Sequence, residues 1–266
     1  MTEKNTPVSF MEIAKKAAQK GREVLEKYYK TPLSIRTKNT QHYNLVTQAD
    51  VECEKAITEV ILAQCPGHNI LAEEHEYGKT GSEYTWIIDP LDGTTNFAHG
   101  LPVWSISIAL ALRGELITGL VWDITRDEQF TAIKDNGAFC NEEAIRVSKA
   151  GRLTESLFSI GFYYDRGEAM KRSLKKIEEL LVMGITDIRR FGSAALDLCW
   201  VACGRIDGYF EYMLNPWDFA AGKLILSEAG GQATTYEGGE TGIKPSSMAA
   251  TNGLIHNELV AFLKKP

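Results

Sequence analysis

The sequence is poor in cysteine and in positive charge, and it has no long apolar run. Its five cysteines, scattered along 266 residues, do not form the pattern of a disulfide framework. A formal net charge of -6 argues against broad binding to nucleic acid or to an anionic membrane. No apolar stretch approaches the ~20 residues of a membrane-spanning helix, and the polar N-terminus lacks a signal-peptide core. These absences predict a soluble cytoplasmic protein.

Several catalytic signatures are also missing. The sequence has no Gly-x-Ser-x-Gly elbow, and its five histidines do not have the spacing of zinc ligands. Gly78-Lys79-Thr80 imitates the end of a P-loop, but Glu73 occupies the position of the required earlier glycine. Cys199 and Cys203 lie one helical turn apart, and core packing explains them better than a metal or redox pair.

The stretch 86–97 combines an apolar strand with a rigid acidic turn. Trp86–Ile88 predicts a buried strand that ends at the carboxylate of Asp89. Pro90 fixes the backbone after that carboxylate, and Asp92-Gly93 makes a turn that opens a helix. Main-chain N–H groups at a helix start attract anions, so the stretch predicts a Mg²⁺-dependent phosphoryl site. A plain strand and turn is the alternative, but two neighbouring acids are costly to bury without a cation.

The rest of the chain alternates between helical and strand patterns. A first helix covers the periodic residues 10–28, and a second opens at the Thr47–Asp50 capping box and stops at Pro66. Further helices are expected at 168–181, 194–202, 217–229 and 256–263, and strands at 69–73, 103–112, 116–121, 129–133, 145–147, 157–160, 186–190, 206–212, 232–235 and 248–251. This order indicates stacked α and β layers without a linker. We expect one domain of two packed halves, approximately 1–150 and 151–266.

Two motifs resemble the signatures of one enzyme family. Residues 89–97, Asp-Pro-Leu-Asp-Gly-Thr-Thr-Asn-Phe, resemble the first signature of the inositol monophosphatase family without a gap. Residues 217–222, Trp-Asp-Phe-Ala-Ala-Gly, resemble the second, and the likeness runs from about Phe10 to the C-terminus. The resemblance implies an α+β fold, layered as an α/β/α/β/α sandwich of the inositol monophosphatase and fructose-1,6-bisphosphatase type. It also implies a phosphoric monoester hydrolase that depends on Mg²⁺ and is sensitive to lithium.

The same resemblance implies oxygen ligands for two or three Mg²⁺ ions. Asp89 would bridge two ions. Glu73 and the main-chain carbonyl of Leu91 would complete the first ion, and Asp92 and Asp218 the second. A weaker third ion would lie near Glu73. Each acid has a plainer alternative, since Glu73 could be a surface acid and Asp218 could simply favour a helix N-terminus.

The resemblance also implies a catalytic set of Asp50, Thr94 and Glu73. Asp50 and the Thr94 hydroxyl match a family pair that orients the attacking water, which would reach phosphorus in line without a covalent enzyme intermediate. Asp50 also fits the capping box, and one side chain could serve both purposes. Main-chain N–H groups of Gly93 and Thr94 would hold the phosphate.

Substrate contacts are expected from both halves of the chain. The implied residues are Asp92, Gly93, Thr94, Gly192, Ser193, Ala194, Glu211 and Asp218. Glu211 would accept a substrate hydroxyl and so reject an analogue without it. An exposed acid at a strand end is the alternative for Glu211. His99 follows the first motif and is expected in a loop near the entrance of the site.

These residues predict hydrolysis of a small polyol phosphate, with myo-inositol 1-phosphate as the leading candidate. The same machinery could act on 3′-phosphoadenosine 5′-phosphate, fructose 1,6-bisphosphate, histidinol phosphate or an inositol-lipid head group. A different class stays open, because some bacterial relatives are interaction proteins of the transcription machinery and residues 189–198 resemble that branch. No membrane or direct nucleic-acid partner is expected, and the family is usually homodimeric.

Overall fold

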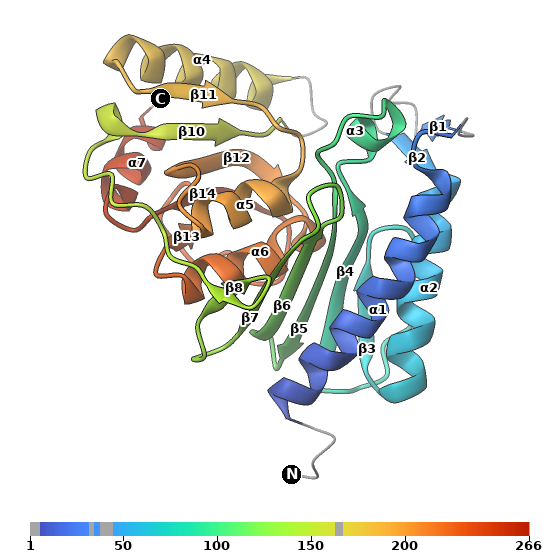
Figure 1. Cartoon of the computed structure of the whole chain (residues 1–266). Coiled ribbons are helices and arrows are strands. Elements are labelled where there is room, and N and C mark those ends of the chain that lie inside the picture. Colours follow the sequence, from blue (N-terminus) through green and yellow to red (C-terminus); the bar gives the residue numbers. More distant parts are fainter. Residues whose placement is uncertain (1–5, 32–34, 38–44, 163–166, 266) are drawn as a thin grey trace.

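The computed structural model describes residues 6–31, 35–37, 45–162 and 167–265, which form alternating layers of helix and sheet (Figure 1). Helices α1 (Pro7–Tyr28) and α2 (Gln48–Gln64) cover one face of a seven-stranded sheet. Helices α5 (Ala194–Ala202) and α6 (Pro216–Glu228) lie between that sheet and a five-stranded sheet. Helices α4 (Glu168–Met183) and α7 (His256–Leu263) pack on the far face of the second sheet. This arrangement confirms the predicted five-layer α+β sandwich.

The seven-stranded sheet carries the first sequence motif. In spatial order its strands are β3 (Asn69–Ala72), β4 (Tyr84–Asp92), β5 (Ser105–Leu112), β6 (Glu115–Asp123), β7 (Glu128–Ile133), β8 (Ala138–Cys140) and β9 (Glu143–Ala144). Strand β3 runs parallel to β4, and each later pair is antiparallel. The short helix α3 (Thr94–Ala98) follows β4 directly. A separate pair of strands, β1 (Ile35–Thr37) and β2 (Leu45–Thr47), precedes α2.

The five-stranded sheet mixes parallel and antiparallel neighbours. Its spatial order is β11 (Asp187–Arg189), β10 (Leu157–Ile160), β12 (Gly208–Leu214), β14 (Ser246–Thr251) and β13 (Gln232–Thr234). Strand β10 is parallel to β11 and β12, whereas β14 is antiparallel to β12 and β13. Helices α5 and α6 lie between the two sheets. The connections from β11 to α5 and from β12 to α6 therefore lead from the five-stranded sheet toward the seven-stranded sheet.

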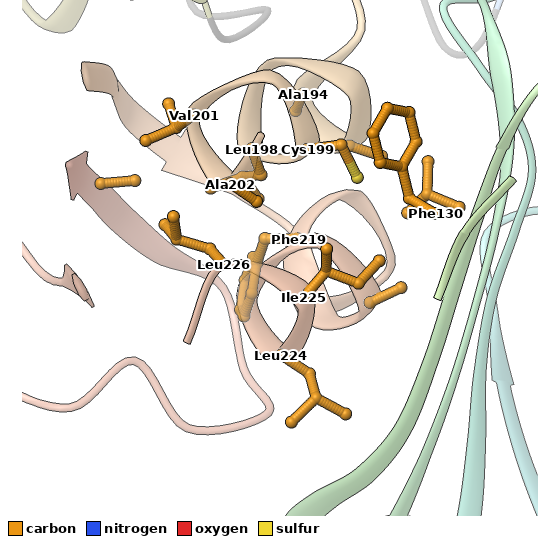
Figure 2. Close-up of a cluster of buried hydrophobic side chains, with 14 of the residues drawn as sticks. Phe130, Ala194, Leu198, Cys199, Val201, Ala202, Phe219, Leu224, Ile225 and Leu226 are labelled. Atoms are coloured by element: carbon orange, nitrogen blue, oxygen red, sulfur yellow. The ribbon is translucent and has the colours of Figure 1, made fainter. Parts of the chain in front are cut away.

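The core between the two sheets is built on α5 and α6 (Figure 2). Leu198 of α5 and Phe219 and Ile225 of α6 are fully buried there, with Phe130 of β7 from the seven-stranded sheet. Gly222 lets the two helices approach, because a Cβ at that position would lie 2.8 Å from the Cβ of Leu198. Truncating a buried phenylalanine in such a core costs about 3–5 kcal/mol. This packing holds the N-terminal ends of both helices in place.

Two local expectations were wrong. The strand through Trp86 does not end at Asp89 but continues to Asp92, with a shift in its pairing to β5 between these two residues. The irregularity accommodates Pro90, which cannot donate to a regular ladder. No strand forms at 145–147, and the short strands β8 and β9 lie just before it. Within the described ranges, none of the helices combines the length and the apolar character required to cross a bilayer.

Candidate active site

A cavity of about 560 Å³ lies between the end of β4 and the second half of the chain. It is lined by Glu73, Asp89, Leu91–Asn96, His99, Gly161, Phe162, Arg190–Ala194, Asp197, Glu211, Leu214, Asn215 and Asp218. Every site residue expected from the sequence belongs to this lining, except Asp50. The loop after β3, the β4–α3 turn, β12 and the N-terminal ends of α5 and α6 each contribute part of the wall.

Asp89 and Asp218 are each held through one carboxylate oxygen atom. Oδ1 of Asp89 accepts a hydrogen bond from the N–H of Leu91 at 3.0 Å, two residues along the same strand. Oδ2 of Asp218 accepts one from the N–H of Asn215 at 2.7 Å, at the start of α6. Outer hydrogen bonds of this kind are typical of carboxylates that bind a metal ion, because they set the direction of the remaining oxygen.

Asp92 joins the two halves of the site. Its Oδ2 accepts hydrogen bonds from the Ser193 hydroxyl at 2.5 Å and from the N–H of Ala195 at 2.8 Å, so it caps α5 from another part of the chain. Asn96 adds a second tie, since its amide donates to the carbonyl of Phe191 at 2.8 Å. The segment 192–194 is therefore held against the first motif, as its place in the expected substrate site requires.

The acids of the cavity repel one another electrostatically. Burial raises the pKa of Asp89 well above its usual range, and the negative charges of Glu73, Asp92 and Asp218 raise it further. Burial raises the pKa of Asp92 to about 6, and that of Asp218 well above its usual range. A hydrogen bond between the Asp89 and Glu73 carboxyl groups adds to the shift at Asp89. Such closely spaced acids are all ionised only where a cation lies among them, and otherwise at least one of them holds a proton.

The donor chemistry fits a hard divalent cation. Glu73, Asp89, Asp92 and Asp218 supply carboxylate oxygens, which Mg²⁺ prefers. The carbonyl of Leu91 lies 3.1 Å from the Thr94 hydroxyl, whose single proton it shares with Asp50, and it keeps a second lone pair. In the described part of the chain, however, no three His, Cys, Asp or Glu side chains already form a metal-binding cluster. These oxygens thus share one cavity but are not assembled into a finished coordination sphere.

Asp50 lies behind the cavity wall and reaches the site through Thr94. It is fully buried, and its Oδ1 accepts a hydrogen bond from the Thr94 hydroxyl at 3.0 Å. Its Oδ2 accepts the N–H and the hydroxyl of Thr47 at 2.8 and 2.5 Å, which completes the predicted capping box of α2. Burial raises the pKa of Asp50 to about 6. Both uses weighed for Asp50 from the sequence are thus geometrically available to one side chain.

Glu211 is buried, so the exposed-acid alternative is wrong. Its Oε2 accepts the Tyr209 hydroxyl at 2.6 Å, and burial raises its pKa to about 7. Gly161 makes room for it, because a Cβ there would lie 1.6 Å from Oε2. The Glu211 carboxyl group faces the cavity opposite the first motif.

Several lining residues were given no site role from the sequence, among them Gly161, Phe162, Arg190 and Asp197. Asp197 lies in the first turn of α5, is buried, and has a pKa that burial raises well above its usual range. The Arg190 guanidinium opposes that shift at both Asp197 and Glu211. An acid within the otherwise apolar run 194–202 was the signal that could have identified Asp197. His99 is exposed at the cavity, as expected.

Known proteins match nearly the whole chain. The model of the inositol monophosphatase family matches residues 7–265. An inositol-1-monophosphatase of Synechocystis sp. is 44% identical over 219 residues, covering 81% of this chain and 75% of that protein. The Nus factor SuhB of Pasteurella multocida is 40% identical over 254 residues, covering 94% of each chain. A solved inositol monophosphatase from Anabaena superposes with a TM-score of 0.86 at 40% identity, covering 96% of this chain and 95% of that one.

Proposed function

This chain belongs to the inositol monophosphatase family, whose members are metal-dependent phosphatases of small phosphate esters, and we propose that it hydrolyses a polyol phosphate monoester. The proposed reaction converts myo-inositol 1-phosphate to myo-inositol and phosphate. The observation that carries the proposal is the meeting of Asp89, Asp92, Asp218 and Glu211 at one cavity. Three of these acids fit a cation, and the fourth fits a substrate hydroxyl.

The chain's own residues would hold the metal and align the water. Mg²⁺ held by Glu73, Asp89, Asp92, Asp218 and the Leu91 carbonyl would supply an acidified water and neutralise charge on the phosphate. The Thr94 hydroxyl can donate a hydrogen bond to Asp50 at 3.0 Å and still accept one from water, which would direct a water lone pair toward phosphorus. Helix α3 begins at Thr94, so its first N–H groups have no partner one turn earlier and are suited to phosphate oxygens.

Substrate selection would come from Glu211 and Asp92. Tyr209 occupies Oε2 of Glu211, and in the described part of the chain no donor contacts its Oε1. That oxygen is suited to a substrate hydroxyl, and a buried carboxylate left without a partner would penalise an analogue that lacks it. Asp92 would add a second hydroxyl contact, with Gly192, Ser193 and Ala194 alongside.

A substrate panel tests this function. Purified protein with Mg²⁺ should release phosphate from myo-inositol 1-phosphate with higher kcat/KM than from the esters that share the chemistry. The alternatives are 3′-phosphoadenosine 5′-phosphate, fructose 1,6-bisphosphate, histidinol phosphate and an inositol-lipid head group. Preference for one of these would replace the substrate and keep the chemistry. Full turnover in the presence of a chelator would contradict the proposed chemistry itself.

Several finer properties rest on family resemblance alone. We propose two or three Mg²⁺ ions per site, sensitivity to lithium, a homodimer and a cytoplasmic location. Light scattering of the purified protein would establish the mass in solution. Lithium inhibition at fixed Mg²⁺ would test the ion requirement independently of the substrate.

A second candidate function is suggested by the Nus factor SuhB relatives. The chain would then act through a protein interaction with the transcription machinery, with or without catalysis. Recovery of RNA polymerase factors in equal amounts by wild type and by Asp218→Asn would support a role independent of the acids. No recovery by either protein would leave the enzyme function as the account of this chain.

A further inference from the structure

We propose that Glu54 is a positioning residue that holds the Glu73 carboxylate in the active site. The inference rests on the proposed function, in which Glu73 binds Mg²⁺. Glu54 does not line the cavity, and no part of the reaction described above uses it. It is nevertheless a fully buried acid on α2, the helix that also carries Asp50.

The described hydrogen bonds of the Glu54 carboxylate all go to the segment that follows Glu73. Its Oε2 accepts a hydrogen bond from the N–H of Glu74 at 2.7 Å. Its Oε1 lies 2.7 Å from Nδ1 of His75 and accepts the hydroxyl of Tyr77 at 3.2 Å. Strand β3 has ended at Ala72, so these contacts fix a segment that leaves the sheet.

The contact with Glu74 acts directly on Glu73. The peptide unit between these two residues is planar and rigid, so fixing its N–H also fixes the carbonyl and Cα of Glu73. The origin and direction of the Glu73 side chain follow from that Cα. Glu54 therefore controls where the carboxylate of Glu73 stands without touching it.

Helix α2 ties this control to the catalytic pair. Asp50 and Glu54 are four residues apart and lie on the same helix face, about 6 Å apart along the axis. The carboxylate of Asp50 accepts the Thr94 hydroxyl, and Thr94 and Glu73 line the same cavity. One rigid helix thus sets the distance between the water-orienting pair and the Glu73 ligand.

A purely structural role would not need a carboxylate here. Burying a charged group costs free energy unless its hydrogen bonds are made, and an apolar side chain would pack α2 at lower cost. The Glu74 N–H, His75 Nδ1 and the Tyr77 hydroxyl contact two separate oxygen atoms, and a carboxylate supplies both. A glutamate at position 54 is explained if the position of the segment that follows Glu73 matters to function.

Magnesium binding by variants of the full chain tests the inference. Glu54→Gln keeps the size and one acceptor oxygen but loses the second acceptor and the charge. We expect its Mg²⁺ affinity, measured by calorimetry, to fall about 10- to 100-fold, as for other outer contacts of a metal ligand. Phosphate release should need correspondingly more Mg²⁺, with kcat at saturating Mg²⁺ little changed. Adding Glu54→Gln to Glu73→Gln should weaken binding no further, because Glu54 acts through Glu73.

Thr58→Val is the matched control, one turn further along the same helix face. Thr58 contacts the Tyr77 hydroxyl at 3.4 Å and no described hydrogen bond joins it to Glu74, so its Mg²⁺ affinity should match wild type. Should Glu54→Gln fail to fold, His75→Gln at the half-exposed partner decides, with a smaller loss in the same direction expected.

These measurements distinguish the positioning role of Glu54 from the proposed role of Glu73 as a Mg²⁺ ligand. Wild-type Mg²⁺ affinity in folded Glu54→Gln, or in His75→Gln if the first variant does not fold, would overturn the positioning role. An additive loss in the double variant would also overturn it. If Glu73→Gln itself binds Mg²⁺ like wild type, the ligand set of the proposed function is at fault.

Discussion

Helices α2 and α6 each have an aspartate in the first turn. In both helices the carboxylate of this aspartate accepts a hydrogen bond from the main-chain N–H of the residue that precedes the helix. Oδ2 of Asp50 accepts the N–H of Thr47 at 2.8 Å, and Oδ2 of Asp218 accepts the N–H of Asn215 at 2.7 Å. The local motif is the same, and it fixes the backbone direction in both cases. The surroundings of the second oxygen differ, and we propose that the roles of the two acids differ for this reason.

Asp50 has donors on both oxygens, whereas Asp218 has one oxygen turned to a cavity. The Thr94 hydroxyl occupies Oδ1 of Asp50, and the side chain is sealed from solvent. Asp218 lines the cavity with Asp89 and Asp92. Burial and the negative charges of Glu73, Asp92 and Glu211 raise its pKa well above its usual range. A capped acid with full hydrogen bonds can orient a neighbour, and a capped acid with a spare oxygen can bind a cation.

Asp218→Asn should have the largest effect. Losing a direct ligand should cost more than the ~100-fold upper range for outer contacts in Mg²⁺ affinity, and phosphate release should be abolished. The metal-free Tm should not fall, because the variant removes a buried acid whose charge its neighbours oppose. Calorimetry with Mg²⁺ and thermal unfolding in chelator measure the two effects. Unchanged Mg²⁺ affinity would contradict the proposed difference between Asp218 of α6, as a metal ligand, and Asp50 of α2.

Asp50→Asn should separate catalysis from metal binding. We expect kcat to fall by roughly 100-fold, the lower range for a misplaced acid–base group, with Mg²⁺ affinity close to wild type. The measurement is the Mg²⁺ dependence of phosphate release at saturating substrate. A large loss of Mg²⁺ affinity would assign Asp50 and Asp218 the same role.

Substitutions of Thr94, the donor of the hydrogen bond to Asp50, test the proposed role of Asp50 independently. Thr94→Val removes the hydroxyl between Asp50 and the Leu91 carbonyl, and we expect a loss of about 10-fold or more in kcat. Thr94→Ser keeps the hydroxyl and should retain most of the activity. Full activity in Thr94→Val together with a loss in Thr94→Ser would show that the methyl group, not the hydroxyl, matters at this position.

The pH dependence of metal-free stability should show the smallest effect. The pKa of Asp50 is raised from 3.8 to about 6, so its protonation stabilises the folded chain fully below pH 3.8 and is lost as pH rises through about 6. Between pH 5 and 7 this loss is about 1 kcal/mol for one such group. In chelator, Tm should fall over this range by about 3 °C more in wild type than in Asp50→Asn. Parallel Tm curves for the two proteins would contradict the assignment.

Much of the fold followed from local patterns. Helical periodicity and capping residues predicted α1, α2, α5 and α6 to within a few residues. The exit of β4 was placed three residues early, because pairing with β5 beyond Pro90 depends on a distant strand. Strands β8 and β9 are two or three residues long, too short for any alternation to mark them.

The site was predictable in composition but not in orientation. The motifs named the acids that the cavity brings together, and their roles stay predictions. The burial of Glu211 depends on Gly161, 50 residues earlier, which no local pattern connects to it. The opposite uses of Asp50 and Asp218 depend in the same way on Thr94 and on the neighbouring acids. Contacts between distant segments decide which oxygen is free, and a single sequence does not contain them.

The central claim is that these buried acids form a magnesium site, and titration of Asp89→Asn with Mg²⁺ tests it most directly. Asp89 is a buried acid of the cavity, and the charges of Glu73, Asp92 and Asp218 all raise its pKa. Calorimetry should detect Mg²⁺ binding to the wild-type protein and none to a folded Asp89→Asn variant at the same concentrations. Equal Mg²⁺ binding by the two proteins would contradict the account.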